Sequence, residues 1–197
     1  MDILRLFFDC DECCQDFLPR LTARQLPAGK PHRRRASGLS TSQVMTLVIL
    51  FETSGLRNFK TFSTQRLLSD LRPEFPGAVS DQRCVELQAS AVIPRAAFLD
   101  SRLGTCSGLS FVDATRSAIC HHRPINSHKV LCGVAKRGQT SGGRCSGCKV
   151  HLVIKDCGAL LAVVLTPGQV DDRRPVAGLS RKLCGKLLGD RGSSSQE

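Results

Sequence analysis

The chain has 197 residues, of which 41% are hydrophobic, so it is long enough for one large domain or two small ones with a buried core. No apolar run reaches the roughly 18 residues of a membrane span, and Met1-Asp2-Ile3-Leu4 lacks the basic start of a signal peptide, so we expect a soluble, cytoplasmic protein with no membrane partner. The net charge of +11 is concentrated in residues 101–197, with 15 Lys and Arg against 6 Asp and Glu, which predicts a polyanionic partner, most often nucleic acid.

Hydrophobic periodicity predicts that the first half is helical. The predicted helices are residues 3–18 ending near Pro19, a helix capped by Ser40 with Gln43 and closed by Gly55, one that follows Arg57-Asn58-Phe59-Lys60 and stops at Pro73, and one from Ser80 or Asp81 to Pro94. Short connections and basic turns fit a helix-turn-helix module that binds DNA. A plain helical scaffold fits almost as well, because no recognition helix stands out.

Two groups of basic residues in this half are candidates for phosphate contacts. The linker over residues 27–38 contains Arg33, Arg34 and Arg35, and the turn before the third predicted helix contains Arg57 and Lys60. Side chains of this kind neutralise DNA phosphates when they are clustered. A solvated loop is an equally good interpretation of the linker.

After Gly108 the pattern changes to strands. The predicted elements are a strand over 109–115 that carries Asp113, a weaker strand over 129–135, a hairpin of 148–155 and 159–166, a helix capped by Asp171 or Asp172 and reaching Leu183, and a short strand over 187–190 that ends at Asp190. In the hairpin, Lys149 and His151 share one face of their strand with Val153, and we expect them to meet DNA or water.

The order of these elements permits two carboxylates to meet. If the first and the last strand of this series lie side by side in a mixed sheet, Asp113 and Asp190 approach each other. Paired carboxylates bind Mg²⁺ or Mn²⁺ through oxygen ligands, and such ions assist the cleavage of phosphodiesters. Taken alone, each Asp is also compatible with a role as a turn residue or a helix cap.

Five segments, in order along the chain, resemble the DDE-type transposases of bacterial insertion sequences. They are Leu56-Arg57-Asn58-Phe59-Lys60, the run from Cys106 to Thr115, Lys149-Val150-His151-Leu152-Val153-Ile154, the run from Leu165 to Arg173, and Leu188-Gly189-Asp190-Arg191-Gly192. The resemblance implies a ribonuclease H-like fold that performs DNA transposition and recombination with Mg²⁺ or Mn²⁺. It matches Asp113 to the first catalytic carboxylate of the family and Asp190 to the second. It also implies DNA ends and target DNA as partners, a homo-oligomer, and a bacterial cytoplasm with nucleoid association.

This sequence departs from the family pattern in one clear respect. The family uses a third carboxylate, a Glu on a later helix, whereas this sequence stops seven residues after Asp190, and Glu197 is too close to Asp190 to match it. We therefore expect a truncated copy, with catalytic activity and inactivity both left open. Two alternatives remain open, which are a DNA-binding remnant without catalysis and a zinc-binding nucleic-acid module built on Cys145-x-x-Cys148 with His151, His121, His122 or His128.

The expected architecture is α+β in two parts. Residues 1–104 form a helical region with a DNA-binding role, and residues 105–197 form an incomplete ribonuclease H-like domain with a mixed sheet. Asp113 and Asp190 are the expected catalytic and metal-binding residues. The expected nucleic-acid contacts are Arg33, Arg34, Arg35, Arg57, Lys60, Lys129, Lys149 and His151.

Overall fold

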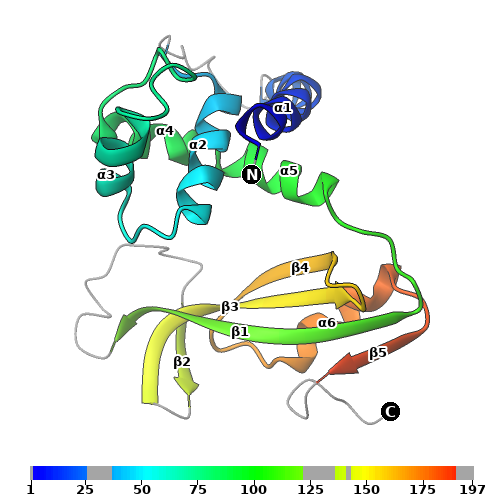
Figure 1. Ribbon diagram of the computed structural model, residues 1–197. Coiled ribbons are helices and arrows are strands. Elements are labelled where there is room, and N and C mark those ends of the chain that lie inside the picture. Colours follow the sequence, from blue (N-terminus) through cyan, green and yellow to red (C-terminus); the bar gives the residue numbers. More distant parts are fainter. Residues whose placement is uncertain (1, 26–36, 122–135, 141–142, 190–197) are drawn as a thin grey trace. The chain divides into compact units, whose positions relative to one another are not determined.

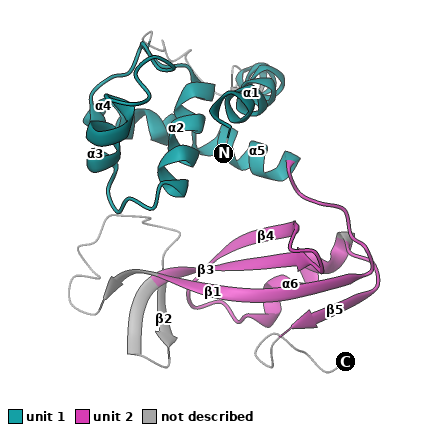
Figure 2. Ribbon diagram, in the orientation of Figure 1, with its two compact units in different colours: residues 1–101 teal, residues 102–197 magenta. Residues whose placement is uncertain are grey.

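The computed structural model describes residues 2–25, 37–121, 136–140 and 143–189, and it divides into two compact units (Figures 1 and 2). The first unit is Met1–Ser101 and the second is Arg102–Glu197. Helices in the first unit and a mixed sheet in the second confirm the α+β class. No helix in the described parts of the chain is both long and apolar enough to cross a membrane.

The first unit is built from helices around one apolar core. They are α1 (Ile3–Gln25), α2 (Thr41–Thr53), α3 (Phe59–Phe62), which continues as a π-helical turn over Ser63–Leu67, α4 (Asp81–Ser90) and α5 (Val92–Ser101). Met45, Leu47, Phe62 and Leu67 are almost completely buried in this core. The predicted capping box is confirmed, because the Ser40 side chain accepts from the Gln43 amide while the Gln43 side chain accepts from the Ser40 amide.

Two predicted helix ends in this unit are wrong, and both involve proline. Helix α1 continues through Pro19 to Gln25. A proline removes one backbone donor, yet the helix continues past it. Within this part of the helix, Arg20 is paired to Asp16 at 2.6 Å and Thr22 donates to the Leu18 carbonyl at 2.9 Å. The helix predicted to end at Pro94 is two helices, and Pro94 lies in the first turn of α5, where its missing N–H costs little.

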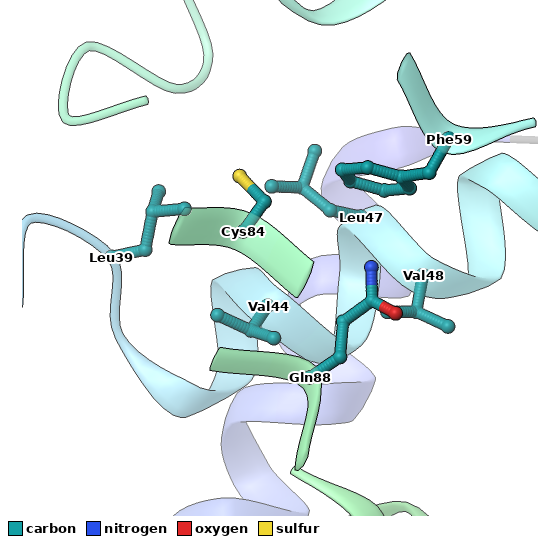
Figure 3. A pocket seen from close by; sticks show the side chains of 7 residues that line it. All are labelled: Leu39, Val44, Leu47, Val48, Phe59, Cys84 and Gln88. Atoms are coloured by element: carbon teal, nitrogen blue, oxygen red, sulfur yellow. The ribbon is translucent and has the colours of Figure 1, made fainter. Parts of the chain in front are cut away.

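A small pocket lies between α2, α3 and α4 (Figure 3). Its lining is apolar except for one amide and one thiol, and consists of Leu39, Val44, Leu47, Val48, Phe59, Cys84 and Gln88. The amide nitrogen of Gln88 is buried and has no hydrogen-bond partner among the described residues. Burial raises the pKa of the Cys84 thiol, so this lining is uncharged near neutral pH.

The second unit contains one mixed sheet with α6 (Arg173–Leu179) packed on it. The strands are β1 (Leu109–His121), β2 (Lys136–Thr140), β3 (Gly143–Lys155), β4 (Leu160–Pro167) and β5 (Lys186–Gly189). The order is β2-β3-β1-β5, and β4 pairs with β3. All pairs are antiparallel except β1 with β5, which is parallel. The predicted hairpin is confirmed as β3 and β4, whereas the strand predicted over 129–135 lies outside the described residues.

Only one face of this sheet is covered by α6. Val112 of β1 and Val153 of β3 lie opposite each other and pack, together with Leu161, against Leu179 of the helix. Because strand side chains alternate between faces, Phe111 points to the other face, where it is 38% exposed. The helix ends at Leu179, earlier than predicted, and a single 3-10 turn over Ser180–Lys182 follows it.

Candidate active site

The strands β1 and β5 lie side by side, as the sequence predicts. Their parallel register pairs Leu109 with Lys186 and continues to Val112 with Gly189. Residues Asp113 and Asp190 are the next residues along the sequence from this last pair. The structure therefore pairs the two residues that directly precede the candidate carboxylates, although Asp190 itself lies outside the described residues.

Two glycines at the start of these strands make their close approach possible. Gly108 has a φ of 102° and Gly185 a φ of 85°, both in the region that favours glycine. The Lys186 amide donates to the Gly108 carbonyl at 2.7 Å, which begins the parallel pairing. A methyl group on Gly185 would overlap that carbonyl oxygen, so only glycine allows the two segments this spacing.

Asp113 is exposed on the face opposite α6. One of its carboxylate oxygens accepts from the Ala114 amide at 2.8 Å. Among the described residues, no Lys or Arg forms an ion pair with it. Its neighbour across the sheet is Leu152 of β3. The carboxylate is thus held in place by the backbone while one oxygen remains available to a cation.

Lys149 and His151 are buried, which contradicts the expectation that they meet DNA or water. They share a face with Val153 as predicted, but this is the face that α6 and the preceding loop cover. The Lys149 ammonium donates to the Val170 carbonyl at 2.6 Å and lies 2.8 Å from an Asp172 carboxylate oxygen. Its side chain is only 8% exposed.

His151 occupies the same buried polar cluster. Its Nε2 is hydrogen-bonded to the Thr166 hydroxyl at 2.8 Å, and its Nδ1 is buried with no partner among the described residues. Burial lowers the pKa of the imidazole below its usual range, opposed by the nearby Asp172 carboxylate. The ring is therefore neutral at physiological pH and contributes no charge to DNA binding.

The remaining predicted DNA contacts divide into two sets. Arg57 and Lys60 are exposed on either side of Asn58, whose side chain accepts from the Thr61 amide and caps α3. The other predicted contacts lie outside the described residues, and these are Arg33, Arg34, Arg35 and Lys129.

The zinc interpretation gains no support from the described strand. Cys148 and His151 are three positions apart on β3, in a stretch of unbroken antiparallel pairing with β1. Residues separated by an odd number of positions lie on opposite faces of a strand, so these two side chains diverge. Within the described parts of the chain, no group of three His, Cys, Asp or Glu side chains is arranged to hold a metal ion.

A cysteine pair that sequence reasoning missed lies beside the β1–β5 junction. The Cys106 sulfur lies 3.1 Å from the Cys184 carbonyl oxygen and 3.3 Å from the Cys184 amide nitrogen. These backbone contacts from Cys184, followed by that of Gly108, lower the pKa of the Cys106 thiol to about 6. The only sequence signal is weak, since each cysteine closely precedes one of the two junction glycines.

Comparison with known proteins finds a match for the second unit. A protein-family model described as Transposase DDE domain matches residues 103–197, a range that includes the whole β-sheet, α6 and both candidate carboxylates. No curated protein and no solved structure matches the chain significantly. Residues 103–197, just under half of the 197-residue chain, therefore match the model of the transposase DDE domain family.

Proposed function

We propose that this chain acts in DNA transposition, with Asp113 and Asp190 as the ligands of a divalent metal, Mg²⁺ or Mn²⁺. One observation carries the proposal, namely the parallel register that ends at Val112 and Gly189 in a domain that matches the model of the transposase DDE family. If this register extends by one residue, the two carboxylates are neighbours on the same sheet face.

The donor chemistry of the described residue fits such a metal. Carboxylate oxygens are preferred ligands of Mg²⁺ and Mn²⁺. Asp113 is exposed, and its carboxylate is oriented by the Ala114 amide instead of being neutralised by a described Lys or Arg. A bound divalent ion supplies activation of the attacking hydroxyl and stabilises the leaving oxygen of a phosphodiester. The protein would contribute the fixed placement of the two carboxylates.

The same proposal covers the fold of the second half of the chain and the DNA-binding role of the first half. Residues 105–197 form a ribonuclease H-like domain, and residues 1–104 hold the DNA, with the exposed Arg57 and Lys60 contacting phosphates. The excess of basic residues in 101–197 supports a polyanionic substrate. DNA binding that depends on phosphate contacts weakens steeply with added salt.

The test compares three isosteric variants of the full chain. Asp113→Asn and Asp190→Asn each remove one proposed ligand charge. Asp156→Asn makes the same change at the β3–β4 turn, where Asp156 accepts from Ser107 at 3.2 Å, and serves as the matched control. Mn²⁺ binding is measured by electron paramagnetic resonance, and nicking of supercoiled plasmid DNA is measured in Mg²⁺ and in Mn²⁺.

We expect the first two variants to lose Mn²⁺ binding and nicking while the control keeps both. DNA affinity should stay unchanged or rise in Asp113→Asn, because a carboxylate that repels phosphate is removed. Equal Mn²⁺ binding in all four proteins would refute the ligand assignment. Salt-sensitive DNA binding without nicking in any of them would instead support a DNA-binding protein without catalysis.

A further inference from the structure

Cys106 and Cys184 are brought together by the junction that pairs β1 with β5. They are 78 positions apart in the sequence. The Cys106 sulfur contacts both the amide nitrogen and the carbonyl oxygen of Cys184, at 3.3 and 3.1 Å, and the Ser110 hydroxyl lies 3.6 Å away. The two cysteine side chains also contact each other. A disulfide requires side chains placed next to each other in this way.

The junction glycines fix this proximity. Gly108 and Gly185 lie against each other with positive φ, so the segments that carry the two cysteines cannot drift apart while β5 remains paired. Cys184 is exposed and Cys106 is half-buried against the core beneath the sheet. Both thiols therefore combine a fixed partner with access from solvent.

We propose that Cys106 and Cys184 form a thiol-oxidation site, in which Cys106 reacts with small-molecule disulfides and Cys184 resolves the product into an intramolecular disulfide. In the first step, the Cys106 thiolate attacks one sulfur of the small disulfide and expels the other as a thiolate. In the second step, deprotonated Cys184 attacks the Cys106 sulfur and expels the second small thiolate. Two protein thiols are oxidised, and one small disulfide is reduced to two thiols.

The charge pattern of the pair assigns the order of these steps. With its pKa lowered to about 6, Cys106 is mostly thiolate at pH 7. The pKa of Cys184 is raised, first by its side-chain contact with Cys106 and then by the Cys106 charge. Once Cys106 is bonded to the small molecule its charge is gone, so the obstacle to ionising Cys184 is removed at the point where Cys184 must react.

The expected rate advantage of Cys106 is modest. A pKa three units below the ordinary 9.0 raises the thiolate fraction at pH 7 about ninetyfold, but the less basic thiolate is intrinsically about 15 to 30 times less nucleophilic. Together these factors predict a reaction about three to six times faster than at an ordinary exposed thiol. The specificity of the site must therefore come mainly from the resolving step, which only a neighbouring cysteine permits.

The bond would tie the start of β5 to the start of β1. It closes a long loop, which restricts the unfolded chain most strongly. Oxidation should therefore protect β5 from detachment, and, as far as Asp113 and Asp190 bind metal as proposed above, it should favour metal binding. The thiol chemistry itself does not depend on that proposed function.

The test exposes the full reduced chain to oxidised glutathione, with intact mass and peptide mapping as readouts. The wild type should lose two thiols and yield a linked peptide pair containing Cys106 and Cys184. Cys184→Ser should instead accumulate one glutathione on Cys106. Cys157→Ser, which removes an exposed cysteine from the β3–β4 turn, should behave as the wild type does.

Two results would overturn the proposal. One is that Cys106 of the wild type keeps its glutathione and no Cys106–Cys184 peptide pair forms, because Cys184 then does not displace the glutathione. The other is that glutathione is attached to Cys106 no faster than to Cys157. Both are mass measurements made without metal or DNA, so they remain informative even if Mn²⁺ binding and nicking are absent.

Discussion

Replacing Gly185 with alanine should detach β5 from β1, whereas the same replacement at Gly158 should not. The two positions are closely matched in backbone conformation, with φ values of 85° and 83°. They differ in their surroundings. A methyl group at Gly158 meets no atom within 4 Å, while one at Gly185 overlaps the Gly108 carbonyl oxygen. Gly158→Ala therefore serves as the control that isolates the conformational cost.

The difference between the variants follows from the contacts at the junction. A left-handed conformation costs a residue with a side chain about 1–2 kcal/mol, and both variants incur it. At Gly185 the segments must also separate, which breaks the 2.7 Å bond from the Lys186 amide to the Gly108 carbonyl, worth about 1 kcal/mol. Partial exposure of Leu187, which packs against the core of the sheet, adds about 1 kcal/mol. The expected difference is thus about 2 kcal/mol, or roughly thirtyfold in an opening equilibrium.

Hydrogen exchange followed by mass spectrometry measures this difference locally. The chain has no Trp and no Tyr, so intrinsic fluorescence offers no useful probe, and two compact units make a single unfolding midpoint ambiguous. Peptides that cover Lys186–Gly189 should exchange about thirty times faster in Gly185→Ala than in Gly158→Ala. Equal exchange of these amides in the two variants would refute the argument that close approach at Gly185 holds β5.

Two further predictions concern the buried polar cluster. Lys149→Met should destabilise the second unit by about 2–3 kcal/mol, which is below the range for fully buried pairs because the Asp172 side chain is 23% exposed. Adding Asp172→Asn should recover part of the loss, as measured by hydrogen exchange of peptides from β3. Because burial depresses the pKa of His151 in the folded protein, its contribution to stability should be complete above about pH 6.5 and decline as the pH falls below that value, where the unfolded chain binds the proton first. Hydrogen exchange of β3 peptides at pH 7.5 and 5.5, corrected for the intrinsic exchange rate at each pH, should show this decline in the wild type. A His151→Gln variant with the same decline would contradict the assignment.

The elements that the sequence predicts well are those with local signals. Ser40 and Gln43 specify a helix start by themselves, and Asp156-Cys157-Gly158 specifies a hairpin turn between two apolar runs. The pairing of β1 with β5 is not local, but the order of strand, hairpin, helix and strand leaves few ways to build one sheet. In these cases neighbouring residues or simple connection rules contain the necessary information.

The burial of Lys149 and His151 was not predictable from the same rules. An alternating strand with Lys and His on one face normally turns that face to water, since isolated charges are costly to bury. Here the cost is offset by partners supplied from elsewhere in the chain, which are the Val170 carbonyl and the Asp172 carboxylate for Lys149 and the Thr166 hydroxyl for His151. These partners follow the residues that they contact by 15 or more positions, so no local pattern reveals them.

This buried cluster also explains how the far side of the sheet supports the candidate site. Lys149 holds the loop at Val170 and Asp172 against β3, and α6 begins directly after Asp172. The helix then packs Leu179 against Val112, the residue that both pairs with Gly189 and precedes Asp113. The charge of Lys149 thus acts on the site through packing and not through DNA contact. Disturbance of the cluster should loosen the strand that positions Asp113 without changing the chemistry of its carboxylate.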